Sequence, residues 1–130
     1  MSDVQIGRYF KEHEMECQCG KCLKTVFDAN LIRKLDAMRE ELGRPITITS
    51  GYRCKSHNKN VGGSPNSQHL YGKAADIAVY EYKVNDKVLP RMTAVELLPY
   101  AEKYGFDGIG LYSWGLHVDV RGYKARWDYR

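Results

Sequence analysis

Two histidines and one aspartate lie beside predicted strand ends, where they could hold a metal ion. His69 and His117 are two of the four histidines of the chain, and Asp76 follows His69 by seven residues. Neutral imidazoles and a carboxylate are typical ligands of Zn²⁺, and three protein ligands leave a fourth position for water, as in catalytic sites. Taken singly, the same residues also fit a polar loop histidine, a buried aspartate with hydrogen-bond partners and an ordinary strand histidine.

Four cysteines form a second candidate cluster. Cys17, Cys19 and Cys22 lie in one short stretch, and Cys54 follows at a distance. Four thiolates that converge on one ion form a structural zinc site, whereas a disulfide from Cys17 or Cys19 to Cys54 would use two of them. We expect a structural role, as metal ligands, a disulfide or small buried thiols, because no histidine is positioned to activate a catalytic thiol.

The segments on either side of residue 50 predict two helices and a strand. Asp28 can cap a helix whose apolar side chains form one stripe, and Gly43 can end it. The alternating β-branched residues 46–49 predict a strand. Residues 55–60 favour a short helix, which follows the turn-rich stretch 50–53.

The segments around the candidate ligands predict three more strands. Residues 74–80 are small and apolar and predict a central strand, and 81–91 form an exposed insertion. Residues 108–112 and 116–120 predict two antiparallel strands joined by a turn at 113–115. We therefore expect an α+β fold with a mostly antiparallel central sheet, helices packed on one side and the zinc site at strand ends.

One further helix is predicted between these strands. Thr93 and Glu96 form a capping box, and Gly105 can end the helix that follows. Pro99 should kink this helix or move its start to about Leu98, because proline lacks the backbone donor that a helix interior requires.

Length and composition fit a single small domain over residues 1–130, with the cysteine-containing segment 1–25 packed on it. The chain has 130 residues, 43% of them hydrophobic, and no apolar run near the roughly 18 residues of a membrane span. Its net charge of +4 comes from interspersed basic and acidic residues, which gives no support to a nucleic-acid-binding arm. The N-terminus lacks the apolar core of a secretory signal, so we expect synthesis in the cytoplasm.

Three segments combine the residues that could do chemistry. They are Ser50-Gly51-Tyr52-Arg53, Ser67-x-His69-x-x-Gly72-x-Ala74-x-Asp76 and His117-Val118-Asp119. The combination closely resembles the zinc peptidases of the D-Ala-D-Ala carboxypeptidase and murein endopeptidase group, which share the hedgehog and D,D-peptidase type of zinc fold. The resemblance covers about residues 10–122. Members cleave peptide bonds in the stem peptides or crosslinks of bacterial peptidoglycan, and some are phage endolysins.

The resemblance implies a role for five residues. It implies that zinc is held by His69, Asp76 and His117. It also implies that Arg53 faces the substrate carbonyl or carboxylate and that Ser67 is a substrate-binding hydroxyl. A zinc-bound water, with a pKa near ~7, would then attack the scissile carbonyl, and a guanidinium can neutralise the oxyanion or bind a terminal carboxylate.

The sequence departs from the resemblance at the general base. Related branches place an acidic residue three positions before the last histidine, or a histidine two positions before it, but Trp114 and Gly115 stand there. Asp119 is the nearest acid and shares a strand face with His117. Three interpretations stay open for it: a catalytic base, a partner that orients His117, or a surface ion pair with Arg121.

The aromatic composition indicates a binding groove. Ten tyrosines against three phenylalanines favour surfaces that are apolar at one end and wet at the other. We expect Tyr71 and Trp114, which adjoin the metal ligands in sequence, to bind substrate at the rim of a groove for an extended peptide.

The sequence as a whole predicts a zinc metallopeptidase, a carboxypeptidase or endopeptidase that hydrolyses peptidoglycan stem peptides or crosslinks. Its cofactor would be one catalytic Zn²⁺, with a second, structural Zn²⁺ at the cysteines as one of the alternatives there. Two other functions stay open: a non-catalytic zinc-binding module that recognises the cell wall, and a cysteine-centred zinc protein that binds nucleic acid.

The predicted activity carries expectations about partners and location. We expect peptidoglycan peptides as partners, neither nucleic acid nor a membrane, and a monomer. A murein peptidase made without a signal would reach the bacterial cell wall by lysis, a phage holin or an unconventional route, which favours a phage or prophage origin.

Overall fold

The computed structural model describes residues 4–22 and 25–130. Its helices and strands follow one another in this order: the 3₁₀ helix η1 (Glu12–Met15), α1 (Ala29–Leu42), β1 (Thr47–Ser50), α2 (Lys55–Asn60), the 3₁₀ helix η2 (Gln68–Tyr71), β2 (Ala74–Ala78), β3 (Tyr82–Val84), β4 (Lys87–Leu89), α3 (Ala94–Lys103), β5 (Gly108–Tyr112), β6 (Gly115–Asp119) and β7 (Ala125–Asp128).

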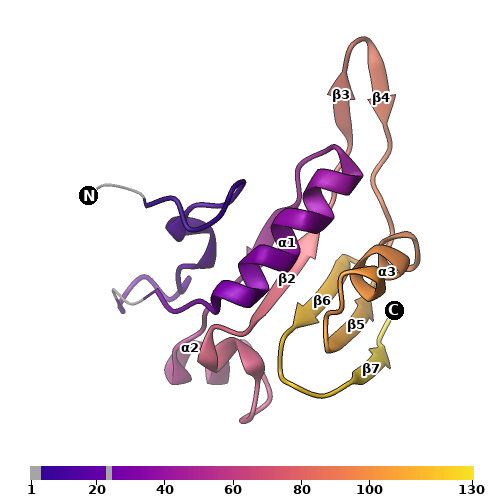
Figure 1. The fold of residues 1–130 in the computed structure, drawn as a ribbon. Helices are drawn as coiled ribbons and strands as arrows, with labels where there is room; N and C mark the ends of the chain where they lie inside the picture. The colour runs from indigo at the N-terminus through magenta and orange to yellow at the C-terminus, as the bar shows by residue number, and fades with distance from the viewer. Residues whose placement is uncertain (1–3, 23–24) are drawn as a thin grey trace.

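A five-stranded sheet of order β1-β2-β6-β5-β7 forms the centre of the fold (Figure 1). Neighbouring strands are antiparallel, except that β7 runs parallel to β5. The expected α+β class with a mostly antiparallel sheet is confirmed. Strand β7 was not predicted, and it extends the sheet on the side of β5.

The two faces of the sheet have different characters. Side chains alternate between faces along a strand. One set, which includes Ile77, Ile109 and Val118, packs with the apolar side chains of α1 and α3 in a buried core. Figure 1 shows these two helices in front of the sheet. The other face therefore carries Asp76 and His117, so the candidate metal ligands lie on the side of the sheet away from these helices.

Local sequence signals set the helix ends. The Asp28 side chain accepts hydrogen bonds from the first turn of α1, and Gly43 ends the helix with a left-handed φ of 66°. The capping box of Thr93 and Glu96 starts α3 directly, so the predicted shift of its start to about Leu98 is wrong. Pro99 is accommodated because the carbonyl that loses a partner, at position 95, lies in an exposed turn and can bind water.

The predicted insertion forms a hairpin of β3 and β4 that projects from the body of the fold (Figure 1). Asn85 and Asp86 have φ values of 48° and 63°, as a two-residue turn between strands requires. At the base of the hairpin, the buried Arg44 donates to the carbonyl of Tyr80 at 2.7 Å. Arg44 thus attaches the hairpin to the body of the fold.

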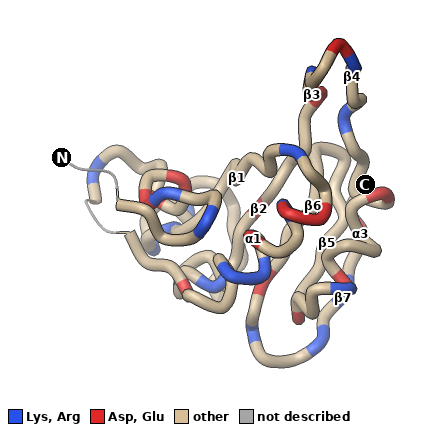
Figure 2. Tube along the Cα trace, turned by 45° about the horizontal axis from the view of Figure 1, so that its top comes forward, with Lys and Arg blue, Asp and Glu red and all other residues tan. Residues whose placement is uncertain are grey.

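Charged residues are distributed over many elements. Figure 2 shows lysine, arginine, aspartate and glutamate interspersed along the trace. Among residues 4–22 and 25–130, no helix has the length and apolar character that crossing a membrane would require.

Candidate metal centre

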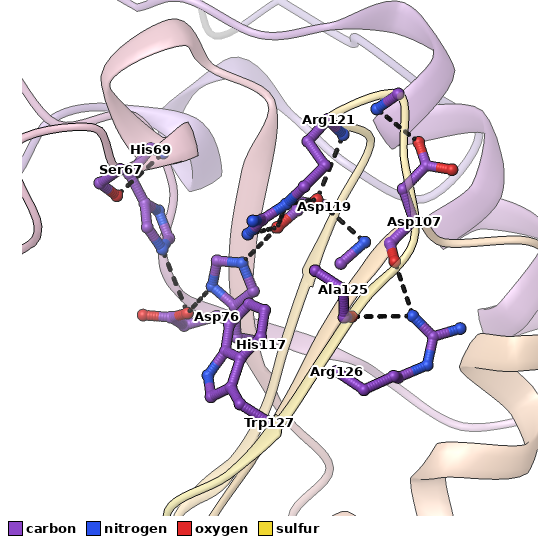
Figure 3. Close-up of polar contacts among 12 residues, drawn as sticks. Ser67, His69, Asp76, Asp107, His117, Asp119, Arg121, Ala125, Arg126 and Trp127 are labelled. Carbon is purple, nitrogen blue, oxygen red and sulfur yellow. Dashed lines mark hydrogen bonds and ion pairs between the residues drawn. The ribbon is translucent and has the colours of Figure 1, made fainter.

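The three predicted ligands converge at one point (Figure 3). Asp76 on β2 and His117 on β6 are direct cross-strand partners, and His69 comes from η2, which precedes β2. The Oδ1 atom of Asp76 lies 3.2 Å from Nε2 of His69 and 3.1 Å from Nδ1 of His117. All three residues are buried, with exposed fractions of 2% for His69, 8% for Asp76 and 7% for His117.

The local geometry of η2 explains two other residues of the motif. The Ser67 hydroxyl oxygen accepts the backbone N–H of His69 at 3.2 Å and so caps the helix that carries this ligand. Gly72 ends the helix with a φ of 68°, and a Cβ atom there would lie 2.4 Å from the carbonyl oxygen of Val26. Ser67 therefore has a structural contact to His69 in addition to its place in the groove described below.

Each histidine ring contacts a second partner through one nitrogen, and its other nitrogen points at Asp76. Nδ1 of His69 donates to the carbonyl oxygen of Gly51 at 2.7 Å, and Nε2 of His117 donates to Oδ2 of Asp119 at 2.7 Å. If these nitrogens carry the protons, Nε2 of His69 and Nδ1 of His117 both point lone pairs at a carboxylate. Three acceptors facing one another require a positive charge between them.

The distances fit a zinc ion. Tetrahedral bonds of ~2.0–2.2 Å separate neighbouring ligand atoms by about 3.4 Å, close to the two separations at Asp76 and within the 4.8 Å limit that encloses all three donors. Burial acts to lower the pKa of His117, but hydrogen bonds with Asp119 and Asp76 outweigh it and raise this pKa. Burial acts to raise the pKa of Asp76, but the two imidazoles outweigh it and lower this pKa. The site therefore favours bound positive charge, and its donor set suits Zn²⁺.

Asp119 lies behind His117 (Figure 3). It is fully buried and accepts hydrogen bonds from Nε2 of His117, from the backbone N–H of Gly108 at 3.0 Å and from Arg121 at 2.7 Å. A Cβ atom on Gly108 would lie 2.2 Å from the Asp119 carboxylate, so glycine makes the space for it. Asp119 thus contacts Nε2 of His117, whereas Asp76 contacts Nδ1 of the same ring.

Arg53 contacts the outer oxygen of the central carboxylate. Its Nη2 atom lies 3.2 Å from Oδ2 of Asp76, and its Nε donates to Ser50 Oγ at 3.2 Å. The Arg53 backbone N–H donates to the carbonyl of His69 at 3.0 Å. The Arg53 side chain is 15% exposed, so it is held beside the candidate metal position with one part open to solvent.

Comparison with known proteins agrees with this arrangement. Residues 8–120 match the family model of peptidase M15. The chain belongs to the peptidase M15 family. A stretch of 45 residues is 53% identical to the zinc D-Ala-D-Ala carboxypeptidase of Streptomyces albus G, and this match covers 34% of the chain and 18% of that protein. The family expected from the sequence is confirmed, and it is a family of peptidases.

In this M15 family member, the three predicted ligands lie in a groove of about 840 Å³. Arg53, Ser67 and Trp114, three residues predicted to contact substrate, are among its lining. Tyr71 is not. It is 57% exposed and lies over a neighbouring hollow that also involves Tyr52.

An aromatic wall of the groove was missed by the sequence analysis. Trp127 on β7 lies with its ring centroid 5.0 Å from that of His117, and its Nε1 donates to the Tyr112 hydroxyl at 2.9 Å. Tyr112 in turn stacks on Trp114 at 4.8 Å. A Cβ atom on Gly110 would lie 2.2 Å from the Trp127 indole. The alternating glycines of β5 were thus the available sign that large side chains cover this face.

The four cysteines also converge. Their Sγ atoms all lie within 4.8 Å of one another, and no disulfide joins them. The Sγ atoms of Cys19 and Cys22 are 3.3 Å apart. Hydrogen bonds from the backbone of Cys22 and Lys21 lower the pKa of the Cys19 thiol to about 6. The structure therefore brings together the four residues whose pairing the sequence left open.

Proposed function

We propose that this M15 family member is a zinc metallopeptidase that hydrolyses peptide bonds in peptidoglycan stem peptides or crosslinks. The observation that carries the proposal is the convergence of His69, Asp76 and His117, each buried, on one point of a groove. Similarity to the Streptomyces zinc D-Ala-D-Ala carboxypeptidase supports both zinc and a D-alanyl substrate. A substrate of this kind places the action of the protein at the bacterial cell wall.

The donor atoms assigned to the metal follow from the histidine partners. Nε2 of His69, Nδ1 of His117 and Oδ1 of Asp76 would hold Zn²⁺, because the other ring nitrogens are occupied by Gly51 and Asp119. Zn²⁺ at such a site supplies Lewis acidity, which polarises a carbonyl group and acidifies water.

Arg53 is placed to bind the negative charge of the substrate. Its guanidinium already pairs with Asp76 and faces the groove. A planar fork of donors can bind a terminal carboxylate of a stem peptide or the oxyanion that forms during hydrolysis. The same contact would serve a carboxypeptidase and an endopeptidase.

Asp119 acts as a positioning residue in this proposal. Its carboxylate is enclosed by Gly108, His117 and Arg121, and it meets the edge of His117 that faces away from Asp76. Of the three interpretations that the sequence left open, orientation of the His117 ring agrees best with these contacts. Burial acts to raise the pKa of Asp119, but the hydrogen bonds from His117 and Arg121 outweigh it and lower this pKa.

The aromatic wall gives the groove a surface for an extended peptide. Tyr112, Trp114 and Trp127 present rings along the side that β5, β6 and β7 form. Aromatic faces pack against backbone and small side chains such as those of alanine, while the Tyr112 hydroxyl, which accepts from Trp127, can still donate to a peptide carbonyl. The wall thus suits a chain of short residues better than one with bulky side chains.

One observation favours a second candidate function, a zinc-binding cell-wall module without catalysis. Among the described residues that line the groove, Asp76 is the one carboxylate, so no acidic side chain is in place there as a general base. Release of amino groups from purified murein separates the two functions. The peptidase requires release that stops on chelation and in His69→Ala, whereas a protein that keeps zinc and binds murein without release is the recognition module.

A further inference from the structure

The cysteine cluster joins two distant parts of the chain. Cys17, Cys19 and Cys22 lie around the end of the N-terminal segment, and Cys54 lies between β1 and α2. All four Sγ atoms lie within 4.8 Å of one another. Zn–S bonds of ~2.3 Å in a tetrahedron separate neighbouring sulfurs by about 3.8 Å. The four thiols therefore already surround a space of the size that one zinc ion requires.

Backbone N–H groups point at these sulfurs. Cys19 Sγ accepts from Lys21 at 3.3 Å and from Cys22 at 3.2 Å. Cys17 Sγ accepts from the N–H of Cys54 at 3.4 Å, and Cys54 Sγ accepts from His57 at 3.5 Å. Four donors directed at three sulfurs stabilise thiolates, which are the form that binds metal.

The alternative of disulfides fits these contacts less well. The Sγ atoms of Cys19 and Cys22 stand 3.3 Å apart, well beyond the ~2.05 Å of a bond between them. The turn that carries Cys19 also directs two N–H groups at the same sulfur, and a disulfide sulfur is a weaker acceptor than a thiolate. The arrangement is that of ligands around a common centre.

We propose that a second zinc ion, with a structural role, is bound by Cys17, Cys19, Cys22 and Cys54. The ion ties segment 17–22 to segment 50–54. Beside it, the Tyr52 N–H donates to the Met15 carbonyl at 2.9 Å, and Gln18 Nε2 donates to the Thr49 carbonyl at 2.7 Å. Segment 50–54 also supports the first site, since its Gly51 carbonyl orients His69 and its Arg53 contacts Asp76. The second ion thus fixes the backbone from which two contacts to the candidate metal centre arise.

Metal content of the purified full-length protein tests the proposal without reference to peptidase activity. We expect about two zinc ions per chain in the wild type and about one in Cys19→Ser/Cys22→Ser. The variant His69→Ala/His117→Ala should also hold about one. His57→Gln is the matched control, because His57 borders the same hollow without belonging to the cluster, and it should keep both ions.

Spectroscopy of cobalt-substituted protein keeps the test independent of how well the serine variant folds. Wild type and His69→Ala/His117→Ala should both show intense thiolate-to-cobalt charge-transfer absorption. Absence of this absorption in the wild type, a zinc content that is the same in Cys19→Ser/Cys22→Ser as in the wild type, or an intact mass four hydrogens lower, as two disulfides would give, would overturn the proposal. Two bound ions without murein cleavage would contradict the proposed function and leave the second site standing.

Discussion

The two candidate metal centres differ in what builds them. In the first, Asp76 and His117 are cross-strand partners on a sheet, and the ligands line an open groove. In the second, the cysteines come from irregular segments, and backbone N–H groups donate to three of their sulfurs. A catalytic metal needs rigid ligands and a free position, whereas a structural metal needs a closed set that joins distant segments. The same fold thus offers one centre for chemistry and another for holding the chain together.

Removal of a ligand from the first centre should have the largest effect. For His117→Ala we expect kcat/KM on a murein peptide to fall by about 10³-fold or more, since a Lewis acid contributes several kcal/mol to the transition state. The variant should bind one zinc ion fewer. Retained activity with unchanged zinc content would show that His117 is not a ligand of the first centre.

Arg53 should matter for the reaction and not for the metal. Arg53→Lys keeps the charge but loses the planar fork, and we expect kcat/KM to fall by about 10²-fold, as for loss of an oxyanion donor. Zinc content, measured by mass spectrometry of the metal, should stay at the wild-type value. A loss of zinc would show that Arg53 supports the centre instead of the substrate.

Asp119→Asn separates positioning from base catalysis. If Asp119 orients His117, zinc affinity should weaken by about 10–100-fold and activity should recover at saturating zinc. A competition titration with a chelator measures the affinity. Activity that stays about 10²-fold low or worse at full occupancy would assign a general base to Asp119 instead.

Loss of the cysteine centre should lower the stability of the protein more than its catalytic rate. For Cys19→Ser/Cys22→Ser we expect the thermal unfolding midpoint to fall by about 10 °C, which corresponds to ~3 kcal/mol for a chain of this size. At 25 °C and saturating zinc, kcat/KM should remain within about tenfold of the wild type. A thermal midpoint like that of the wild type would mean that the cluster holds no structural ion.

Of these features, the aromatic wall should contribute least to peptide hydrolysis. Trp127→Phe keeps the ring against His117 but loses the hydrogen bond to Tyr112, and one such bond contributes ~1 kcal/mol. We expect KM for a stem peptide to rise about fivefold with little change in kcat. A change in kcat alone would place the indole nearer to the reacting bond than the groove geometry does.

Local signals made much of this structure predictable. Asp28 and Gly43 mark the ends of α1, and the capping box of Thr93 and Glu96 marks the start of α3, because each acts within one helical turn. The convergence of Asp76 and His117 followed from strands and a resemblance, which is confirmed at the level of the family.

Features that depend on distant contacts were not predictable in the same way. Strand β7 is short, follows β6 in the chain and pairs in parallel with β5, so the position of Trp127 was missed. The meeting of Cys54 with the N-terminal cysteines depends on how segment 50–54 packs, which spacing in the sequence leaves open. The enclosure of Asp119 rests on the space beside Gly108, a detail of packing.

A zinc titration of chelated protein tests the central claim most directly. Metal-free protein would receive zinc in steps while bound metal and the release of amino groups from murein are followed together. The account predicts that release grows with occupancy of the centre formed by His69, Asp76 and His117, and that His69→Ala shows none at any zinc concentration. Full occupancy of this centre without release of amino groups would contradict it.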